Sequence, residues 1–293
     1  MASLKEVKNR INSVSSTRKI TSAMKLVASS KLHKAQGAIE SMLPYEHRLN
    51  AIMSRFVTES QGDVASPYVE HRKVEKAVVV AISSNSSLCG AFNANVIKEM
   101  METVSQLRAD GVSQIEIVPI GAKVAEKAKK LGFNFESNNA ALLDKPIYAS
   151  ASQVAEGLMK RFAEKQIDKV VLIYHHFKNT ASQVLVNETY LPINLSEQSA
   201  VTDDNRSRMQ FDYIIEPSVE EIVGQLIPKV LHLKIYTALL DSLASEHSAR
   251  VMAMQVATDN ADELLNDLTL MYNKTRQAAI TSELLDIVGA SFQ

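Results

Sequence analysis

The fold is decided by residues 218–288, SVEEIVGQLIPKVLHLKIYTALLDSLASEHSARVMAMQVATDNADELLNDLTLMYNKTRQAAITSELLDIV. Apolar residues recur every three or four positions throughout this stretch, and its two helix breakers, Gly224 and Pro228, lie near its start. At 1.5 Å per residue, an unbroken helix of this length measures about 100 Å. Such a rod cannot pack inside a globule of 293 residues, so its apolar stripe needs a partner along its length. We expect Pro228 to split off the first turns.

Residues 1–60 offer that partner, because they form a second helical pattern with Gly37 as the one glycine before Pro44. The spacing of apolar residues slips between Ser15 and Lys19, which predicts a coiled-coil seam with an irregularity. We expect Pro44 to kink or interrupt the helix. The predicted seam comprises Leu4, Val7, Ile11, Val14, Ile20, Met24, Val27, Leu32, Ala35, Ile39 and Met42 in the first helix, and Ile235, Leu239, Leu243, Val251, Met254, Leu264, Leu268, Met271, Ala278, Leu285 and Val288 in the last.

The charges of the two ends favour their pairing. Residues 1–36 carry eight basic side chains against one acid, whereas residues 241–293 carry eight acids against three bases. Each exposed pair contributes only about 0–1 kcal/mol, but the opposite signs favour alignment. Since the two patterns flank one central region, we predict that residues 1–60 and 218–293 pair as a long antiparallel two-helix coiled coil.

The central region, residues 74–215, alternates between strand and helix patterns. Buried strands are predicted at 77–82, 115–121 and 169–177, with helices at 91–108, at 122–131 and around 155–165. This order predicts a Rossmann-like α/β domain with a mostly parallel sheet and helices on its faces. Further strands are expected in 182–193 and 209–215, at an edge of the sheet because of Pro192.

Composition excludes several functions. The net charge of −1 and the pI near 6.7 argue against a nucleic-acid partner. One cysteine, Cys89, allows neither an internal disulfide nor a multi-cysteine metal site. No apolar stretch approaches the roughly 20 residues that cross a bilayer, and the amino end lacks the apolar core of a signal peptide.

The sequence gives little support for catalytic or ligand-binding residues. The segment SSNSSLCGAFN (83–93) follows a strand and opens a helix, but it has a single glycine and matches no phosphate-binding or nucleophile motif. Cys89 is better interpreted as a small buried thiol. His175 and His176 point to opposite faces of a strand end and are predicted to be surface residues, as are His232 and His247 on the long helix. We therefore predict no catalytic residue, no metal and no cofactor.

Two other classes of protein remain open on the residues alone. One is an α/β-fold enzyme dimerised through its long terminal helices. The other is a coiled-coil tether on a membrane or nucleic acid. Cysteine pairs across the seam would crosslink within one chain only if the termini pair with each other.

Both ends of the chain also resemble a known family. NRINSVSSTRKITSAMKLVASSKLHKAQ (9–36) resembles the opening helix of the gamma subunits of F-type ATP synthases, and residues 245–290 resemble their closing helix. The segment SSLCGAFNANV resembles the strand-to-helix junction of the same family, although Ser84, Asn85, Ser86 and Ser87 replace its usual acidic and basic residues. The resemblance covers the whole chain and is weakest between residues 100 and 215.

The resemblance implies a noncatalytic central stalk, or rotor, that transmits rotation between the membrane c ring and the catalytic sites. The implied partners are the alpha and beta subunits of the ring, the epsilon subunit and the c ring, in a peripheral membrane complex on the cytoplasmic face of a bacterial inner membrane, or a mature organellar chain. Contacts with the beta subunit are implied for Met24, Lys25, Arg250, Arg276, Gln277, Thr281 and Glu283. Arg250 is expected at the level of Met24 on the other helix.

Overall fold

The computed structural model describes residues 3–59, 66–133, 135, 137–193, 216 and 218–291. Two compact units make up the chain. The coil unit comprises Met1–Ser30 and Arg250–Gln293, and the α/β unit comprises Lys31–Ala249. The elements are α1 (Leu4–Glu59), β1 (Lys76–Ile82), α2 (Phe92–Ala109), β2 (Gln114–Ile120), α3 (Ala122–Lys130), α4 (Ala141–Asp144), α5 (Tyr148–Ala163), β3 (Lys169–Asn179), β4 (Ser182–Leu191) and α7 (Val219–Ser291).

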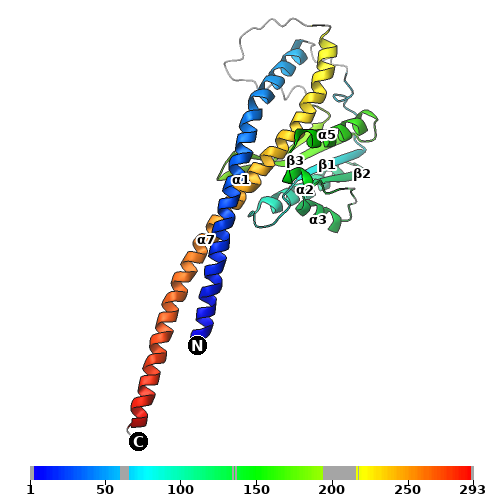
Figure 1. Cartoon of the computed structure of the whole chain (residues 1–293). Helices are drawn as coiled ribbons and strands as arrows, with labels where there is room; N and C mark the ends of the chain where they lie inside the picture. The colour runs from blue at the N-terminus through cyan, green and yellow to red at the C-terminus, as the bar shows by residue number, and fades with distance from the viewer. Residues whose placement is uncertain are drawn as a thin grey trace. The chain divides into compact units, whose positions relative to one another are not determined.

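Within the described residues, four strands form one sheet in the order β2-β1-β3-β4 (Figure 1). The central strand β1 is parallel to both β2 and β3, and Val79 lies beside Ile117 on one side and Val171 on the other. Strand β4 is antiparallel to β3 and lies at the end of this order. The mostly parallel Rossmann-like sheet is therefore confirmed, with its additional strand beyond β3. The strand expected at 209–215 lies outside the described residues.

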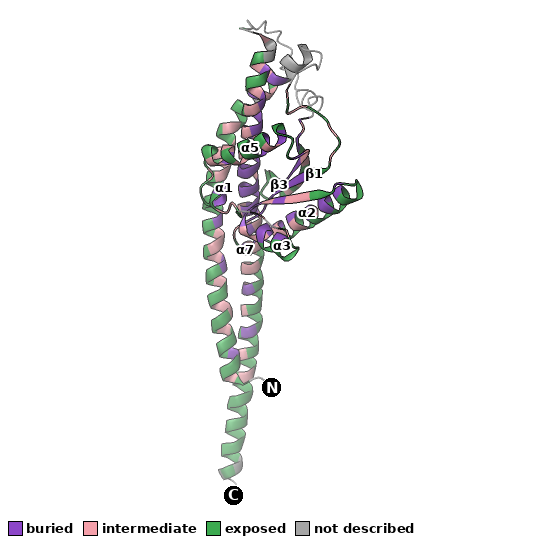
Figure 2. Cartoon of the chain, turned by 90° about the vertical axis from the view of Figure 1, so that its right-hand side faces the viewer, coloured by how far each residue is buried: buried purple, intermediate pink, exposed green. Residues whose placement is uncertain are grey.

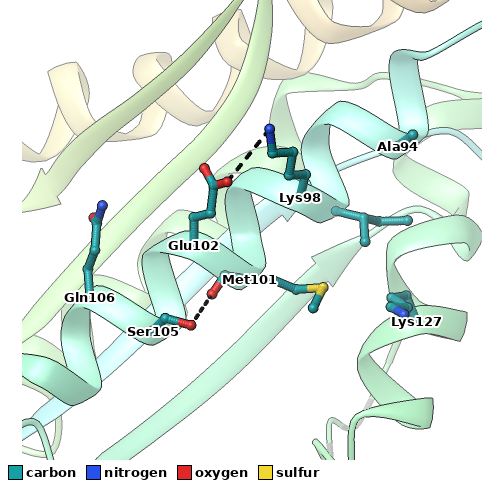
Figure 3. A pocket seen from close by; sticks show the side chains of 8 residues that line it. Ala94, Lys98, Met101, Glu102, Ser105, Gln106 and Lys127 are labelled. Carbon is teal, nitrogen blue, oxygen red and sulfur yellow. Dashed lines mark hydrogen bonds and ion pairs between the residues drawn. The ribbon is translucent and has the colours of Figure 1, made fainter.

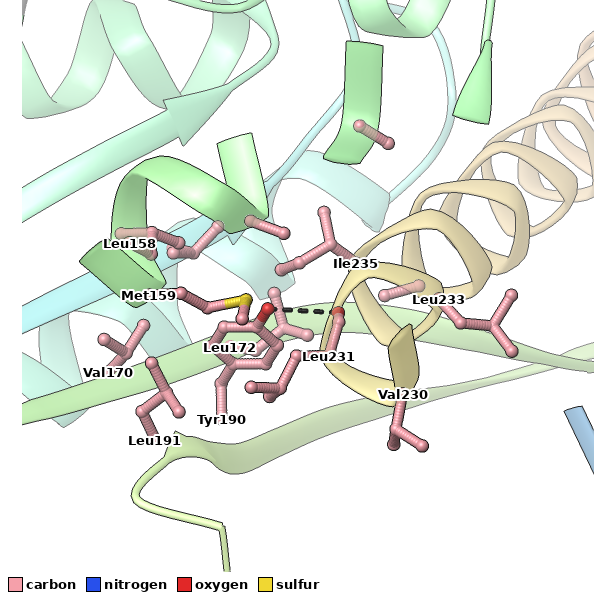
Figure 4. Packing of buried hydrophobic residues seen from close by; sticks show 14 of the residues in the cluster. Leu158, Met159, Val170, Leu172, Tyr190, Leu191, Val230, Leu231, Leu233 and Ile235 are labelled. Carbon is pink, nitrogen blue, oxygen red and sulfur yellow. Dashed lines mark hydrogen bonds between the residues drawn. The ribbon is translucent and has the colours of Figure 1, made fainter. Parts of the chain in front are cut away.

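The two faces of the sheet are covered by different helices, because successive side chains of β1 point to opposite sides. Ala77, Val79 and Ala81 pack with residues of α2 and α3. Val78, Val80 and Ile82 belong to a larger core that includes α5 and the α/β-unit portions of α1 and α7. In this core Tyr190 donates a hydrogen bond of 3.0 Å to the Leu231 carbonyl (Figure 4).

Neither proline ends its helix, so α1 is not interrupted at Pro44 and Pro228 does not split off the first turns of α7. Helix α1 continues through Pro44 and α7 through Pro228. An internal proline costs about 3 kcal/mol or more because it lacks an N–H and crowds the preceding turn. Apolar burial beyond each proline offsets this cost: Met53 and Ile235 are fully buried in the core of the α/β unit.

Two further elements differ from expectation. Helix α5 begins at Tyr148, seven residues before the expected start, because Ala151 and Ala155 already pack into the core. Strand β3 continues to Asn179 because it pairs with β4 beyond the point where β1 ends. His175, which we predicted at the surface, lies in the interior, with 3% of the residue exposed.

Candidate functional site: the helix pair of the coil unit

The seam of the coil unit follows an unbroken spacing of three and four residues along α1. Its inward positions are Leu4, Val7, Ile11, Val14, Arg18, Thr21, Lys25 and Ala28, all buried or half-buried. The predicted irregularity is wrong, because the spacing continues through three polar side chains. Ile20 and Val27, which we predicted in the seam, are 60% and 58% exposed. On α7, Leu264 and Met271 are likewise exposed, and Ala261, Leu265 and Leu268 face inward instead.

Each of the three polar seam residues of α1 has a partner on α7. Arg18 donates to Asp262 at 2.7 Å, and Lys25 donates to Gln255 at 2.7 Å. Between these two pairs, the hydroxyls of Thr21 and Thr258 lie 2.8 Å apart. Polar groups in a coiled-coil seam stabilise one register, since any shift leaves them without partners. We call the three pairs the polar segment of the seam.

The two threonine hydroxyls supply two protons for three hydrogen bonds. Besides the bond between them, Thr21 is 3.0 Å from the Arg18 carbonyl and Thr258 is 2.7 Å from the Met254 carbonyl. One hydroxyl therefore donates across the seam while the other donates to its own helix. Either arrangement leaves neither hydroxyl without a partner.

The polar segment also fixes which residues of the two helices lie level. The residue numbers in its pairs add to 280, 279 and 280, which requires antiparallel helices and places Leu4 level with about residue 276. The antiparallel coiled coil is thus confirmed within the coil unit. Beyond Thr275, α7 extends past the first residue of α1, and residues 276–288 are exposed all round (Figure 2).

The outer face of the pair is rich in apolar side chains. On α1 these include Leu26 beside Ile20 and Val27, and on α7 they include Met252 and Val256. The end of α7 that is not paired with α1 continues the trend with Ile280, Leu284, Leu285 and Ile287. Groups of exposed apolar side chains are typical of surfaces that bind another protein.

The predicted contact residues of α1 lie beside the polar segment. Met24 and Lys25 are half-buried, and the Lys25 ammonium is held by Gln255. Arg250 is only 9% exposed, so little of it is available to a partner. By the register of the polar segment, Arg250 lies level with Ser30 rather than Met24, an offset of six residues or about 9 Å along the helix.

The other predicted contact residues belong to the unpaired end of α7. Arg276, Gln277, Thr281 and Glu283 are all exposed. Thr281 donates a hydrogen bond of 2.9 Å to the Gln277 carbonyl, a local bond that leaves the outer surface of this turn open. The structure thus separates the predicted residues into a group beside the polar segment and a group on the unpaired end.

In the α/β unit, the loop after β1 uses its polar groups to cap α3. Ala122, Lys123 and Val124 donate their backbone N–H groups to Asn85 Oδ1, the Ser84 carbonyl and Ser83 Oγ at 3.2, 3.1 and 3.0 Å. These are the N–H groups that would bind a phosphate at a helix start. The protein's own oxygens occupy these groups, so Ser83, Ser84 and Asn85 have a structural role at the start of α3.

Cys89 and the adjacent histidines also make internal contacts. The Cys89 thiol is buried and accepts a hydrogen bond from Asn93 Nδ2 at 3.1 Å. His175 stacks on Phe92 with ring centroids 4.5 Å apart, and burial lowers its pKa to about 4. His176 is on the other face of β3, where its Nδ1 lies 2.7 Å from Asp241 Oδ2. His232 and His247 are half-buried, not surface residues as predicted.

The surface between α2 and α3 has a broad groove (Figure 3). Ala94, Ile97 and Met101 give it an apolar floor, and Lys98 and Glu102 form a 3.8 Å ion pair on its rim. Among the described residues, no three His, Cys, Asp or Glu side chains are placed to hold a metal ion. No helix in that part of the chain is long and apolar enough to span a membrane.

Fold and surface together define a class of protein: an antiparallel coiled coil with an exposed, mostly apolar end, joined to a Rossmann-like domain. A family model described as ATP synthase matches residues 3–291. The chain is 56% identical to the ATP synthase gamma chain of Phocaeicola vulgatus and 58% identical to that of Bacteroides fragilis, and each alignment covers 99% of both chains. The chain belongs to the family of ATP synthase gamma chains.

A solved structure agrees on the fold. A chain in the central stalk and c ring of the Tetrahymena thermophila mitochondrial ATP synthase superposes with a TM-score of 0.55 at 24% identity, covering 81% of this chain and 99% of that one. The sequence did not reveal the polar segment, because its three residues interrupt the apolar pattern. The unbroken spacing from Val14 through Arg18, Thr21 and Lys25 to Ala28 was the available signal.

Proposed function

We propose that this chain is the central stalk of a rotary ATP synthase and carries rotation between a membrane c ring and the catalytic sites of a ring of alpha and beta subunits. Its partners are those subunits, the epsilon subunit and the c ring, in a peripheral complex on the cytoplasmic face of a bacterial membrane. The chain itself is noncatalytic. Membership of the gamma chain family is the observation that carries this proposal.

The physical basis is asymmetry. A single chain has no threefold axis, so a coiled coil inside a threefold ring presents a different face to each beta subunit. The three sites are thereby held in different states, and turning the stalk changes which site is in which state. The coupling is the difference in contact free energy between the stalk and each conformer, and linkage makes it work in both directions.

The unpaired end of α7 is the part of the coil unit best suited to turn inside such a ring. Residues 276–288 are exposed on every side and carry three charged residues, Arg276, Glu283 and Asp286. Apolar contacts do not fix one orientation as ion pairs would. We propose contacts with the beta subunit through Arg276, Gln277, Thr281 and Glu283, and a second set through Met24 and Lys25, with Arg250 contributing from within the helix pair.

A charge placed on this end tests the proposal. Ile287 is 66% exposed in the chain, so Ile287→Lys is expected to leave its helicity and melting temperature unchanged. In the assembled complex the same lysine would be desolvated, and we expect ATP turnover to fall at least fivefold. Ile147→Lys, at a 53% exposed position before α5, is the matched control.

Two results would contradict the proposal. One is unchanged turnover in an Ile287→Lys complex of normal composition. The other is failure of the tagged native chain to copurify with alpha and beta subunits. Catalytic activity of the isolated chain would instead favour the α/β enzyme, which family membership does not support.

A further inference from the structure

A cavity of about 320 Å³ lies inside the α/β unit, between α1, the end of β3 and α7. It is distinct from the surfaces of the coil unit and from the groove between α2 and α3. Its apolar lining comes from all three elements: Ile39, Met42 and Leu43 of α1, Phe177 of β3 and Leu240 of α7. The volume falls in the range of small-molecule sites, about 300–1,000 Å³.

The polar groups of this cavity converge from the same elements. Asp241 and His176 line it and are joined at 2.7 Å, with the Asp241 side chain only 15% exposed. Lys234 also lines it, and its ammonium lies 2.9 Å from Glu188 Oε1 and 6.0 Å from the ring centroid of Tyr174. An apolar body and a polar head can therefore both be accommodated.

The charges around the Tyr174 hydroxyl are predominantly negative. Burial raises the pKa of Tyr174, and the carboxylates of Glu188, Asp241 and Glu46 raise it further. Lys234 is the one lysine or arginine among the residues that line this cavity, and His176 adds a charge only when protonated. Among the residues that line the cavity, the two acids Glu46 and Asp241 outnumber the one lysine, which leaves the lining negative when His176 is neutral.

The pKa of Asp241 also indicates that the cavity has too little positive charge to stabilise its carboxylate fully. Burial raises the pKa of its carboxyl group, although His176, Lys234 and the Phe177 backbone act in the opposite direction. The ionised form is thus incompletely stabilised by the protein. A second cation beside this carboxylate would favour its charged form.

We propose that the cavity binds a small organic cation, an amine carried on an aliphatic or aromatic body. The amine lies near Asp241 and Tyr174, and the body packs against the apolar side chains of α1 and α7. The rings of Tyr174 and Phe177 add attraction for a cation. Such a ligand contacts α1, β3 and α7 at once and stabilises the arrangement in which they meet.

The chain has no tryptophan, so Phe177→Trp places a single fluorescent reporter in the lining. The full-length variant is titrated with phenethylamine, and with 2-phenylethanol and phenylacetate as neutral and anionic probes with the same ring. We expect saturable changes in emission with phenethylamine, affinity at least tenfold above that for the alcohol, and no saturation with phenylacetate. Equal affinity for amine and alcohol, or no response to any probe, would overturn the proposal.

Two further variants separate the cavity from nonspecific attraction. Asp241→Asn is expected to weaken phenethylamine binding about tenfold, whereas Asp259→Asn, on an exposed position of α7 in the coil unit, is expected to change nothing. Thr237→Leu narrows the cavity without altering its charge and should weaken binding of both the amine and the alcohol. A rise in the melting temperature of the native chain with phenethylamine provides a measurement that does not need the reporter. Equal effects of the two aspartate variants would contradict the assignment.

Discussion

The register of the coil unit can be tested by a disulfide between Thr21→Cys and Thr258→Cys. A threonine Oγ lies close to where a cysteine Sγ would be, and the two Oγ atoms are 2.8 Å apart. Closing this gap to about 2.05 Å needs a shift of under about 1 Å. The bond would join the start and the end of the chain at one level of the seam.

The expected stabilisation follows from the length of the loop that is closed. The two positions are 237 residues apart. The chain-entropy model gives about 5 kcal/mol for a loop of this size, as an upper bound because strain and residual structure in the unfolded chain reduce it. We expect an increase of about 2–5 kcal/mol in the free energy of unfolding of the oxidised variant over its reduced form.

The assay combines crosslinking with urea unfolding. The oxidised variant should run as a monomer on a nonreducing gel, retain only the Cys89 thiol, and yield a linked pair of peptides that contain positions 21 and 258. Thr21→Cys with Val251→Cys is the matched control, because Val251 also faces inward but lies seven residues, or about 10 Å, further along α7. Efficient crosslinking of the control pair, or covalent dimers of the test pair, would refute the antiparallel register.

Three other changes test the α/β unit by urea unfolding. His175 is buried, and its pKa is about 4 against an ordinary value of 6.5, so the unfolded chain binds more protons than the folded chain between these two values. The free energy of unfolding should therefore fall by up to about 3 kcal/mol as the pH drops from 6.5 to 4. His175→Phe should lessen this fall. Gly121→Ala should lower the free energy of unfolding by about 2–5 kcal/mol, because its φ is 110° and a Cβ there would lie 2.6 Å from the Ser83 carbonyl oxygen. The control, Gly37→Ala, adds a Cβ in open space on α1 and should raise the free energy of unfolding by about 0.5–1 kcal/mol. Asp168→Asn should lower the free energy of unfolding by about 3 kcal/mol, because it removes the mostly buried charge that pairs with Arg72. An equal loss for Glu126→Gln, which removes an exposed charge paired with Lys123, would contradict this reason.

The ion pair of Asp168 also illustrates how local signals and tertiary contacts differ. Burial acts to raise the pKa of Asp168, but hydrogen bonds from the Lys76 and Glu75 backbone and from Arg72 lower it overall. Its stabilising effect should therefore be present above the ordinary pKa and be lost as pH falls through the lowered value. Nothing in the sequence spacing of residues 72 and 168 indicates this contact.

The cavity of the α/β unit could not be predicted from the sequence for a similar reason. His176 and Asp241 are 65 residues apart, and Lys234 and Glu188 are also remote in sequence. Each residue alone fits an exposed position of a strand or helix. They come together only because β3 extends past β1 and packs beside α1 and α7.

The sequence by itself determined the long terminal helices, the alternation of strands and helices between them, and the family. Periodicity and composition are local properties of the chain, so they can be recognised without knowledge of the tertiary contacts. Tertiary structure decided the rest. Packing beyond Pro44 and Pro228 kept both helices continuous, and partners on α7 allowed Arg18, Thr21 and Lys25 to occupy seam positions that an apolar pattern cannot reveal.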